Sequence, residues 1–219
     1  KLFQRFQILD PSICTKRQNS RKGSAAVFPV TEIAEIGKNM ATWNSRGLRG
    51  SALEEFINQT CQQYREKKLA LIQKVPTPIT PVRIDKESRH ITLAYFDKKS
   101  TVDYIGAVQG IPVCFDAKEC ASDTFPLQNI HDHQIAFMRD FEQQGGVSFL
   151  LIYFSKHHRC YYLRFEKLME YWQRQYQGQR KNFKFHEMET EFEIPIKNAT
   201  FVHYLETLNQ DLLVRKKKS

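Results

Sequence analysis

Apolar residues recur along the chain in two rhythms, and each rhythm predicts a different kind of element. Between residues 51 and 66 they return every three or four positions, which places them on one face of a helix. Ser51 and Glu54 have the spacing of a capping box, so a helix is expected to begin there. The run Val147–Phe154 is apolar apart from Ser148, as in a strand with both faces buried.

Shorter apolar runs fill much of the remaining chain and predict further elements. Strands are expected at 69–75, 103–108, 111–118 and 160–165, and helices at 129–144, 166–175 and 200–213. Gly145-Gly146 is typical of a helix end, because glycine readily adopts the left-handed backbone found there. Residues 183–194 carry no clear rhythm. The succession of helix, strands, helix, strands and helix predicts an α/β fold with one mixed central β-sheet flanked by helices.

Three segments depart from this pattern. Residues 1–40 lack periodicity and include a polar, basic, breaker-rich stretch, which predicts a flexible basic N-terminal arm. Residues 41–213 are expected to form one folded domain, followed by a basic C-terminal tail at 214–219. Inside the domain, the excursion at about 76–99 begins with three prolines, which cannot donate to a sheet, and continues as two extended arms.

The charge of the chain is strongly positive and concentrated toward its ends. Lys and Arg number 33 against 24 Asp and Glu, a net charge of +9. Residues 1–50 hold nine of these basic residues and three acids, and the last residues add Arg215–Lys218. Such a balance favours a polyanionic partner, nucleic acid before an acidic membrane, although solubility alone also accounts for it.

Composition excludes several classes of protein. With 41% hydrophobic residues the chain can bury a sizeable core, which excludes disorder of the whole chain. No apolar run approaches the roughly 18 residues of a membrane-spanning helix, and no signal peptide is recognisable. The five cysteines are scattered without a C-x-x-C pair, which argues against a disulfide framework and a zinc site. A reducing, cytoplasmic setting fits this usage best.

One pair of expected strands carries the residues with the clearest chemistry. Asp103 opens the first strand and Asp116 lies on the second, beyond a Gly-containing turn, so a hairpin can bring the two carboxylates together. Asp116 and Lys118 are two apart and share a face of their strand. Carboxylates suit Mg²⁺, and an ammonium group suits a phosphate under attack. A D-x-K triplet is common as a solvated ion pair, but charges inside an apolar strand are costly, and a metal ion offsets that cost.

These residues and their surroundings resemble a known family. Asp103 with Asp116-Ala-Lys118 matches the PD-(D/E)xK nuclease pattern, with Val102 in place of the proline. The surrounding motifs resemble the RecU family of bacterial Holliday junction resolvases over roughly residues 43–213. They are Ser45-Arg-Gly47, Pro76-Thr-Pro78, Ser100–Tyr104, Phe115–Glu119 and, most specific of all, Phe125–Gln134. The resemblance implies a restriction-endonuclease-like nuclease core, with a stalk projecting at about 76–99.

The resemblance also implies roles for individual residues. The metal site, for Mg²⁺ with Mn²⁺ as a substitute, would be formed by Thr101, Asp103, Asp116 and Gln134. Lys118 would stabilise the transition state, and Asp116 stands where many members carry Glu. Glu54 holds the place where related nucleases often have another site carboxylate, and it fits the capping box equally well. DNA contacts are expected from six basic residues: Arg46, Arg49, Arg83, Arg89, Lys98 and Lys99.

The activity implied is Mg²⁺-dependent resolution of four-way DNA junctions by paired nicks, in recombination and DNA repair in a bacterial cytoplasm. A homodimer with two sites suits two matched nicks, and recombination proteins are further candidate partners. Two alternatives stay open. A non-catalytic junction-binding or annealing protein fits the basic ends and the stalk, but not the set Asp103, Asp116 and Lys118. A sequence-specific restriction-type endonuclease is disfavoured by the motif at 125–134.

Overall fold

The structure is a computed structural model that describes residues 51–96, 101–197 and 201–218. The predicted basic arm at 1–40 lies outside the described residues, as do Arg46, Arg49, Lys98 and Lys99. None of the helices in the described ranges is both long enough and apolar enough to cross a membrane.

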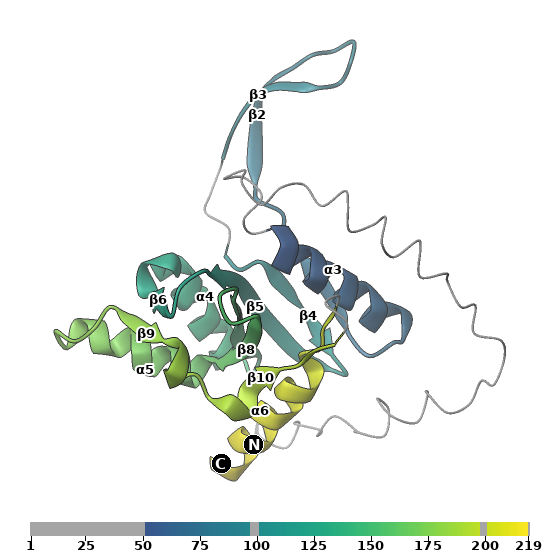
Figure 1. The fold of residues 1–219 in the computed structure, drawn as a ribbon. Coiled ribbons are helices and arrows are strands. Elements are labelled where there is room, and N and C mark those ends of the chain that lie inside the picture. Colours follow the sequence, from purple (N-terminus) through teal and green to yellow (C-terminus); the bar gives the residue numbers. More distant parts are fainter. Residues whose placement is uncertain (1–50, 97–100, 198–200, 219) are drawn as a thin grey trace, which may run out of the picture.

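The centre of the fold is one six-stranded sheet in the order β1-β4-β5-β7-β8-β10 (Figure 1). Its strands are β1 (Leu71–Lys74), β4 (Tyr104–Val108), β5 (Ile111–Cys120), β7 (Val147–Phe154), β8 (Arg159–Arg164) and β10 (Glu193–Ile194). β5 and β7 run parallel, and the other neighbouring pairs are antiparallel. The predicted α/β class with a mixed central sheet is therefore confirmed.

Four helices cover the two faces of this sheet: α3 (Ser51–Glu66), α4 (Asp132–Gln143), α5 (Phe165–Tyr176) and α6 (Leu205–Lys218). Phe149 and Leu151 of β7 pack in one core with α3 and α6. Leu150 and Ile152 point the other way, into a second core with α4 and α5. The strand is buried on both faces, which explains why its sequence is almost uniformly apolar.

Most element boundaries match the sequence, and the differences have local causes. The helix expected at 129–144 begins at Asp132, after a 3-10 turn at Leu127–Asn129, and Gly145 follows it with a positive φ of 82°. The segment without rhythm holds the short strand β9 (Asn182–Lys184), which pairs with β6 (Thr124–Pro126), then two 3-10 turns (Phe185–Glu187 and Thr190–Phe192) and β10. The start of the helix expected at 200–213 is instead a strand, β12 (Phe201–Val202), paired with β11 (Ile196–Lys197).

The excursion after β1 is a separate two-stranded antiparallel hairpin of β2 (Ile79–Ile84) and β3 (Ile91–Phe96), which projects from the body (Figure 1). Pro81 lies within β2, although a proline cannot donate a hydrogen bond to a sheet. It sits at a register shift, and each strand of a two-stranded sheet has a free edge where a missing N–H costs little.

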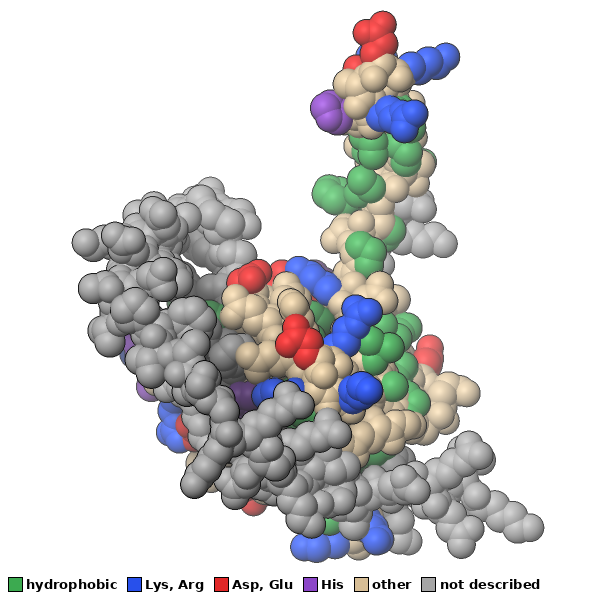
Figure 2. Space-filling model, turned by 90° about the vertical axis from the view of Figure 1, so that its right-hand side faces the viewer, with side chains coloured by type: hydrophobic (Ala, Val, Ile, Leu, Met, Phe, Trp, Pro, Cys, Tyr) green, Lys and Arg blue, Asp and Glu red, His purple; other side chains and the backbone are tan. Residues whose placement is uncertain are grey.

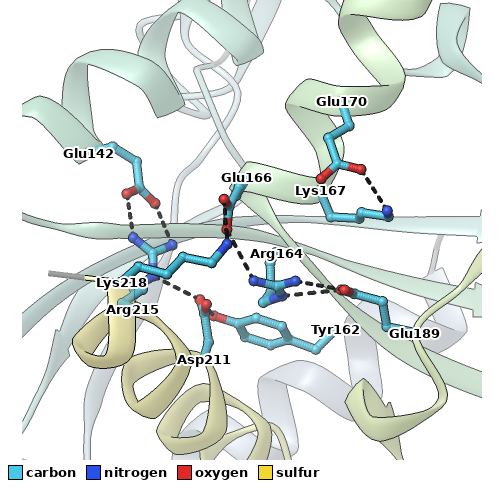
Figure 3. Close-up of polar contacts among 10 residues, drawn as sticks. All are labelled: Glu142, Tyr162, Arg164, Glu166, Lys167, Glu170, Glu189, Asp211, Arg215 and Lys218. Atoms are coloured by element: carbon cyan, nitrogen blue, oxygen red, sulfur yellow. Dashed lines mark hydrogen bonds and ion pairs between the residues drawn. The ribbon is translucent and has the colours of Figure 1, made fainter.

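The C-terminal basic residues belong to α6, which corrects the prediction of a separate tail at 214–219. The Arg215 guanidinium binds both carboxylate oxygens of Glu142 on α4, at 2.5 and 2.9 Å, and its Nε lies 3.2 Å from Asp211 (Figure 3). The Tyr162 hydroxyl donates to the same Asp211 carboxylate at 3.0 Å. Lys218 binds Glu166. Two of the terminal charges are therefore neutralised within the fold and are not free to contact phosphates.

Replacing Arg215→Ala should lower the free energy of unfolding by about 3 kcal/mol, because it leaves two carboxylates without their partner. Burial raises the pKa of Asp211, and Arg215 opposes that rise. Urea unfolding measures the change. Lys217→Ala, at an exposed position of the same helical turn, is the matched control and should stay within about 0.5 kcal/mol of the parent. Equal stability of the two variants would contradict this assignment.

Candidate active site

The hairpin of β4 and β5 brings Asp103 and Asp116 together, as the sequence predicts. Tyr104 pairs with Phe115 in the sheet, so the residues just outside that pair lie opposite each other. The backbone N–H of Asp103 donates to Asp116 Oδ1 at 3.1 Å, and the N–H of Ala117 donates to Asp103 Oδ2 at 3.0 Å. Each carboxylate is thus held by a backbone N–H of the neighbouring strand, which fixes the two relative to one another.

Lys118 and Gln134 complete the surroundings of Asp116. Lys118 Nζ lies 2.5 Å from Asp116 Oδ2, as expected for side chains two apart on a strand. Gln134, in the first turn of α4, donates its amide nitrogen to the same oxygen at 3.0 Å. The Asp116 side chain is completely buried, whereas Lys118 keeps 21% of its side chain exposed. Four of the predicted site residues therefore come from β5, from α4 and from the position just before β4.

The electrostatics of this pair favour a bound cation. Burial, together with the hydrogen bond and the charge of Asp116, raises the pKa of Asp103 to about 7. Two carboxylates in a poorly solvated site repel each other, and Lys118 supplies a single positive charge to offset them. A divalent cation offsets both. The donor set therefore fits a hard metal ion that prefers oxygen ligands.

Gln134 directs the nitrogen of its side-chain amide toward Asp116, whereas a metal ligand would use the amide oxygen. Its oxygen accepts the backbone N–H of His131 at 3.0 Å, in the capping box that starts α4. Because that N–H requires an acceptor, the NH₂ group is left to face Asp116, and an NH₂ group cannot bind a cation. The geometry thus fits Gln134 as a residue that orients Asp116.

The other two predicted site residues are Thr101 and Glu54. Thr101 is exposed in the loop just before Asp103. Glu54 forms an ion pair with Lys74 of β1, on a helix that packs against the opposite face of the sheet from Asp116. Within the described ranges, no three His, Cys, Asp or Glu side chains gather as a metal site. The aspartate pair would therefore need neutral oxygens, such as Thr101 and water, to complete its coordination.

The hairpin is less basic than the sequence suggested. Figure 2 shows apolar side chains along its shaft, with the charged ones gathered at its tip. Arg83 and Arg89 are exposed there, and the acids Asp85 and Glu87 accompany them. Seven large apolar side chains are exposed along the shaft: Ile79, Val82, Ile84, Ile91, Leu93, Tyr95 and Phe96. The sequence contains these apolar residues as two runs rich in β-branched and aromatic side chains. Such runs usually indicate buried strands, so the sequence did not predict that they would be exposed.

Comparison with known proteins identifies a matching protein family. The family model for RecU, Recombination protein U, matches residues 48–210. A protein of Levilactobacillus brevis named Holliday junction resolvase RecU is 37% identical over 182 residues, which span 80% of this chain and 90% of that protein. A protein of the same name from Bacillus licheniformis is 37% identical, over 74% of this chain and 83% of its own length. Another, from Listeria welshimeri, is 40% identical, over 65% of this chain and 73% of its own length. The structure of Archaeoglobus fulgidus Hjc, a Holliday junction resolvase, aligns over 54% of this chain and 74% of its own with 9% identity and a TM-score of 0.32, too weak a likeness to support a conclusion.

Proposed function

This chain belongs to the RecU family, and we propose that it is a Holliday junction resolvase that nicks four-way DNA junctions with the help of Mg²⁺. The observation that carries the chemistry is the buried pair Asp103 and Asp116, with Lys118 against it. A junction-binding protein without nuclease activity would gain nothing from two crowded carboxylates, which cost stability unless a cation accompanies them.

The two aspartates would hold the metal ion, and the Thr101 hydroxyl, two residues before Asp103, would supply a neutral oxygen ligand. Mn²⁺ is an expected substitute, since both ions accept carboxylate and water ligands. When bound, such an ion supplies a water of lowered pKa and neutralises charge on the phosphate. Gln134 keeps the Asp116 carboxylate in its orientation through the hydrogen bond between its amide nitrogen and that carboxylate.

Lys118 would act on the phosphate that is cut. Its side chain is 21% exposed beside Asp116, so a DNA phosphate can approach it. Charge that develops on the phosphate oxygens during attack would be stabilised by this ammonium group. With a metal ion held by Asp116, that carboxylate would attract Lys118 less strongly, and the lysine would be able to turn toward the phosphate.

Two matched nicks resolve a junction, so we propose a two-fold symmetric homodimer with one site in each subunit. The hairpin of β2 and β3 would enter the open centre of the junction, where unpaired bases can stack on Tyr95 and Phe96. Phosphate contacts are proposed for Arg83 and Arg89 of the hairpin, for Lys98 and Lys99 after it in the sequence, and for Arg46 and Arg49 before α3. The expected setting is the cytoplasm, and the four described cysteines, all free and buried, accord with it.

Mg²⁺ should stabilise the folded protein, because a ligand that binds only the folded state raises the free energy of unfolding. The gain is about 2.7 kcal/mol at a free concentration one hundred times the Kd. Thermal unfolding with and without Mg²⁺ measures it without any DNA. Asp116→Asn should abolish the gain, whereas Asp140→Asn, an exposed carboxylate on α4, should retain it. A full gain in the Asp116→Asn protein would remove that residue from the metal site.

Lys118→Ala should slow nicking of a labelled four-way junction by about 10² to 10³-fold while junction affinity changes little. Single-turnover rates at saturating protein isolate this step from binding, which gel shift measures separately. Lys216→Ala, at an exposed position of α6, serves as the control and should nick at the parental rate. If Lys118→Ala also nicked at that rate, Lys118 would have no part in catalysis.

Replacing residues 76–99 by a short Gly-Ser turn should reduce binding to four-way junctions toward the level of a linear duplex, with little loss on the duplex itself. The change leaves Val75 and its 2.8 Å hydrogen bond to the Asp103 carbonyl in place, so the site should survive. Circular dichroism checks the fold. The double variant Tyr95→Ala, Phe96→Ala keeps the hairpin and should show a smaller loss in the same direction. A folded, stalk-less protein that still prefers and resolves junctions would refute this role.

A further inference from the structure

A cavity of about 390 Å³ opens where the start of α4 meets α5, and no role has so far been given to it. Its floor is apolar and buried, formed by Leu127, Ile130 and Trp172. Its rim is polar and carries one acid as well as one lysine: Gln128, His131, Asp132, Gln175 and Lys181. An apolar floor with a few polar groups around it, at a volume within about 300–1,000 Å³, is the usual form of a small-ligand site.

The chemistry of the lining suits a planar heteroaromatic ring. The floor offers apolar contact to its face, while the rim amide of Gln175 and the amine of Lys181 offer hydrogen bonds to its edge. His131 is exposed, and its ring stacks on that of His133 with centroids 5.3 Å apart and an angle of 13° between the planes. Because His131 belongs to the rim, this stacking holds an imidazole ring there. Nucleobases are recognised by this combination of stacking and edge contacts.

The cavity lies beside the nuclease site. The backbone N–H of His131, on the rim, donates to the oxygen of Gln134 at 3.0 Å, and the nitrogen of the same amide donates to Asp116 at 3.0 Å. One side chain therefore separates the rim of the cavity from the buried carboxylate. Successive nucleotides of a strand advance by only about 3.4 Å in a duplex. A phosphate bound at Lys118, which lies against Asp116, would therefore bring the neighbouring bases within reach of the cavity.

We propose that this cavity receives an unpaired nucleobase that neighbours the phosphodiester to be cut, and so gives the enzyme a base preference at one position. The inference rests on the proposed resolvase function. Strand exchange at a junction leaves bases near its centre that can unstack, and a protein pocket that hydrogen-bonds one base edge discriminates by about 1–3 kcal/mol, roughly 5- to 150-fold, against the others.

The test uses the full chain and four junctions that differ only in the base at a single position beside the nick, repeated for each neighbouring position. The value of kcat/KM should vary by about tenfold or more at one position for the parent protein. Gln175→Trp, which puts a bulky ring into the cavity from the surface of α5, should reduce that spread below about threefold. Gln173→Trp carries the same ring on an exposed position of α5 and should keep the parental spread.

A second measurement does not depend on cutting. The Asp116→Asn protein, bound to junctions that carry 5-iodouracil beside the cut site, should crosslink on irradiation to a peptide that contains His131 or Trp172. Equal kcat/KM for all four bases in the parent, an unchanged spread in Gln175→Trp, or crosslinks only elsewhere would each overturn the proposal. Absence of junction nicking by the parent protein under all metal conditions would instead overturn the proposed function itself.

Discussion

Two carboxylates held against each other inside a hairpin are the constraint on which the rest of the site depends. Asp103 and Asp116 are each tied to a backbone N–H of the neighbouring strand, so neither can move away to relieve the repulsion between them. The sheet register that pairs Tyr104 with Phe115 sets this arrangement, and the parallel neighbour β7 buries it from the far side. Lys118 and Gln134 are the local compensation, and a cation completes it.

Much of this could be predicted from the sequence, because the relevant signals are local. The two-residue period of a strand places Asp116 and Lys118 on one face, and the glycine turn brings Asp103 opposite. The helical period predicted α3, and an apolar run interrupted only by Ser148 predicted β7. Long-range charge pairing was beyond such reasoning. Glu54 binds Lys74 twenty residues away, and Arg215 binds Glu142 seventy-three residues away, and nothing in either neighbourhood indicates its partner.

The hairpin of β2 and β3 shows a different limit of prediction from sequence. Its sequence was interpreted through its charges, yet the structure places those at the tip and leaves an apolar shaft exposed on both strands (Figure 2). An isolated two-stranded sheet is at best marginally stable in water. Apolar side chains at exposed positions add little to the stability of the hairpin alone. Their presence is better explained by contacts between the hairpin and another molecule. Periodicity reports whether a side chain is apolar, and not whether another molecule will cover it.

The side-chain amide of Gln134 caps the start of α4 and also orients the Asp116 carboxylate. One side chain therefore affects both the thermal stability of the protein and the geometry of its site. Glutamate is the usual alternative at the third position of a capping box, and it would accept the same backbone N–H. Here it would add a third negative charge beside Asp116. Attempts to make the protein more heat-resistant by optimising its helix starts therefore have to leave Gln134 of α4 unchanged. Substitution at this position is restricted both by the need to cap the helix and by the need to orient Asp116.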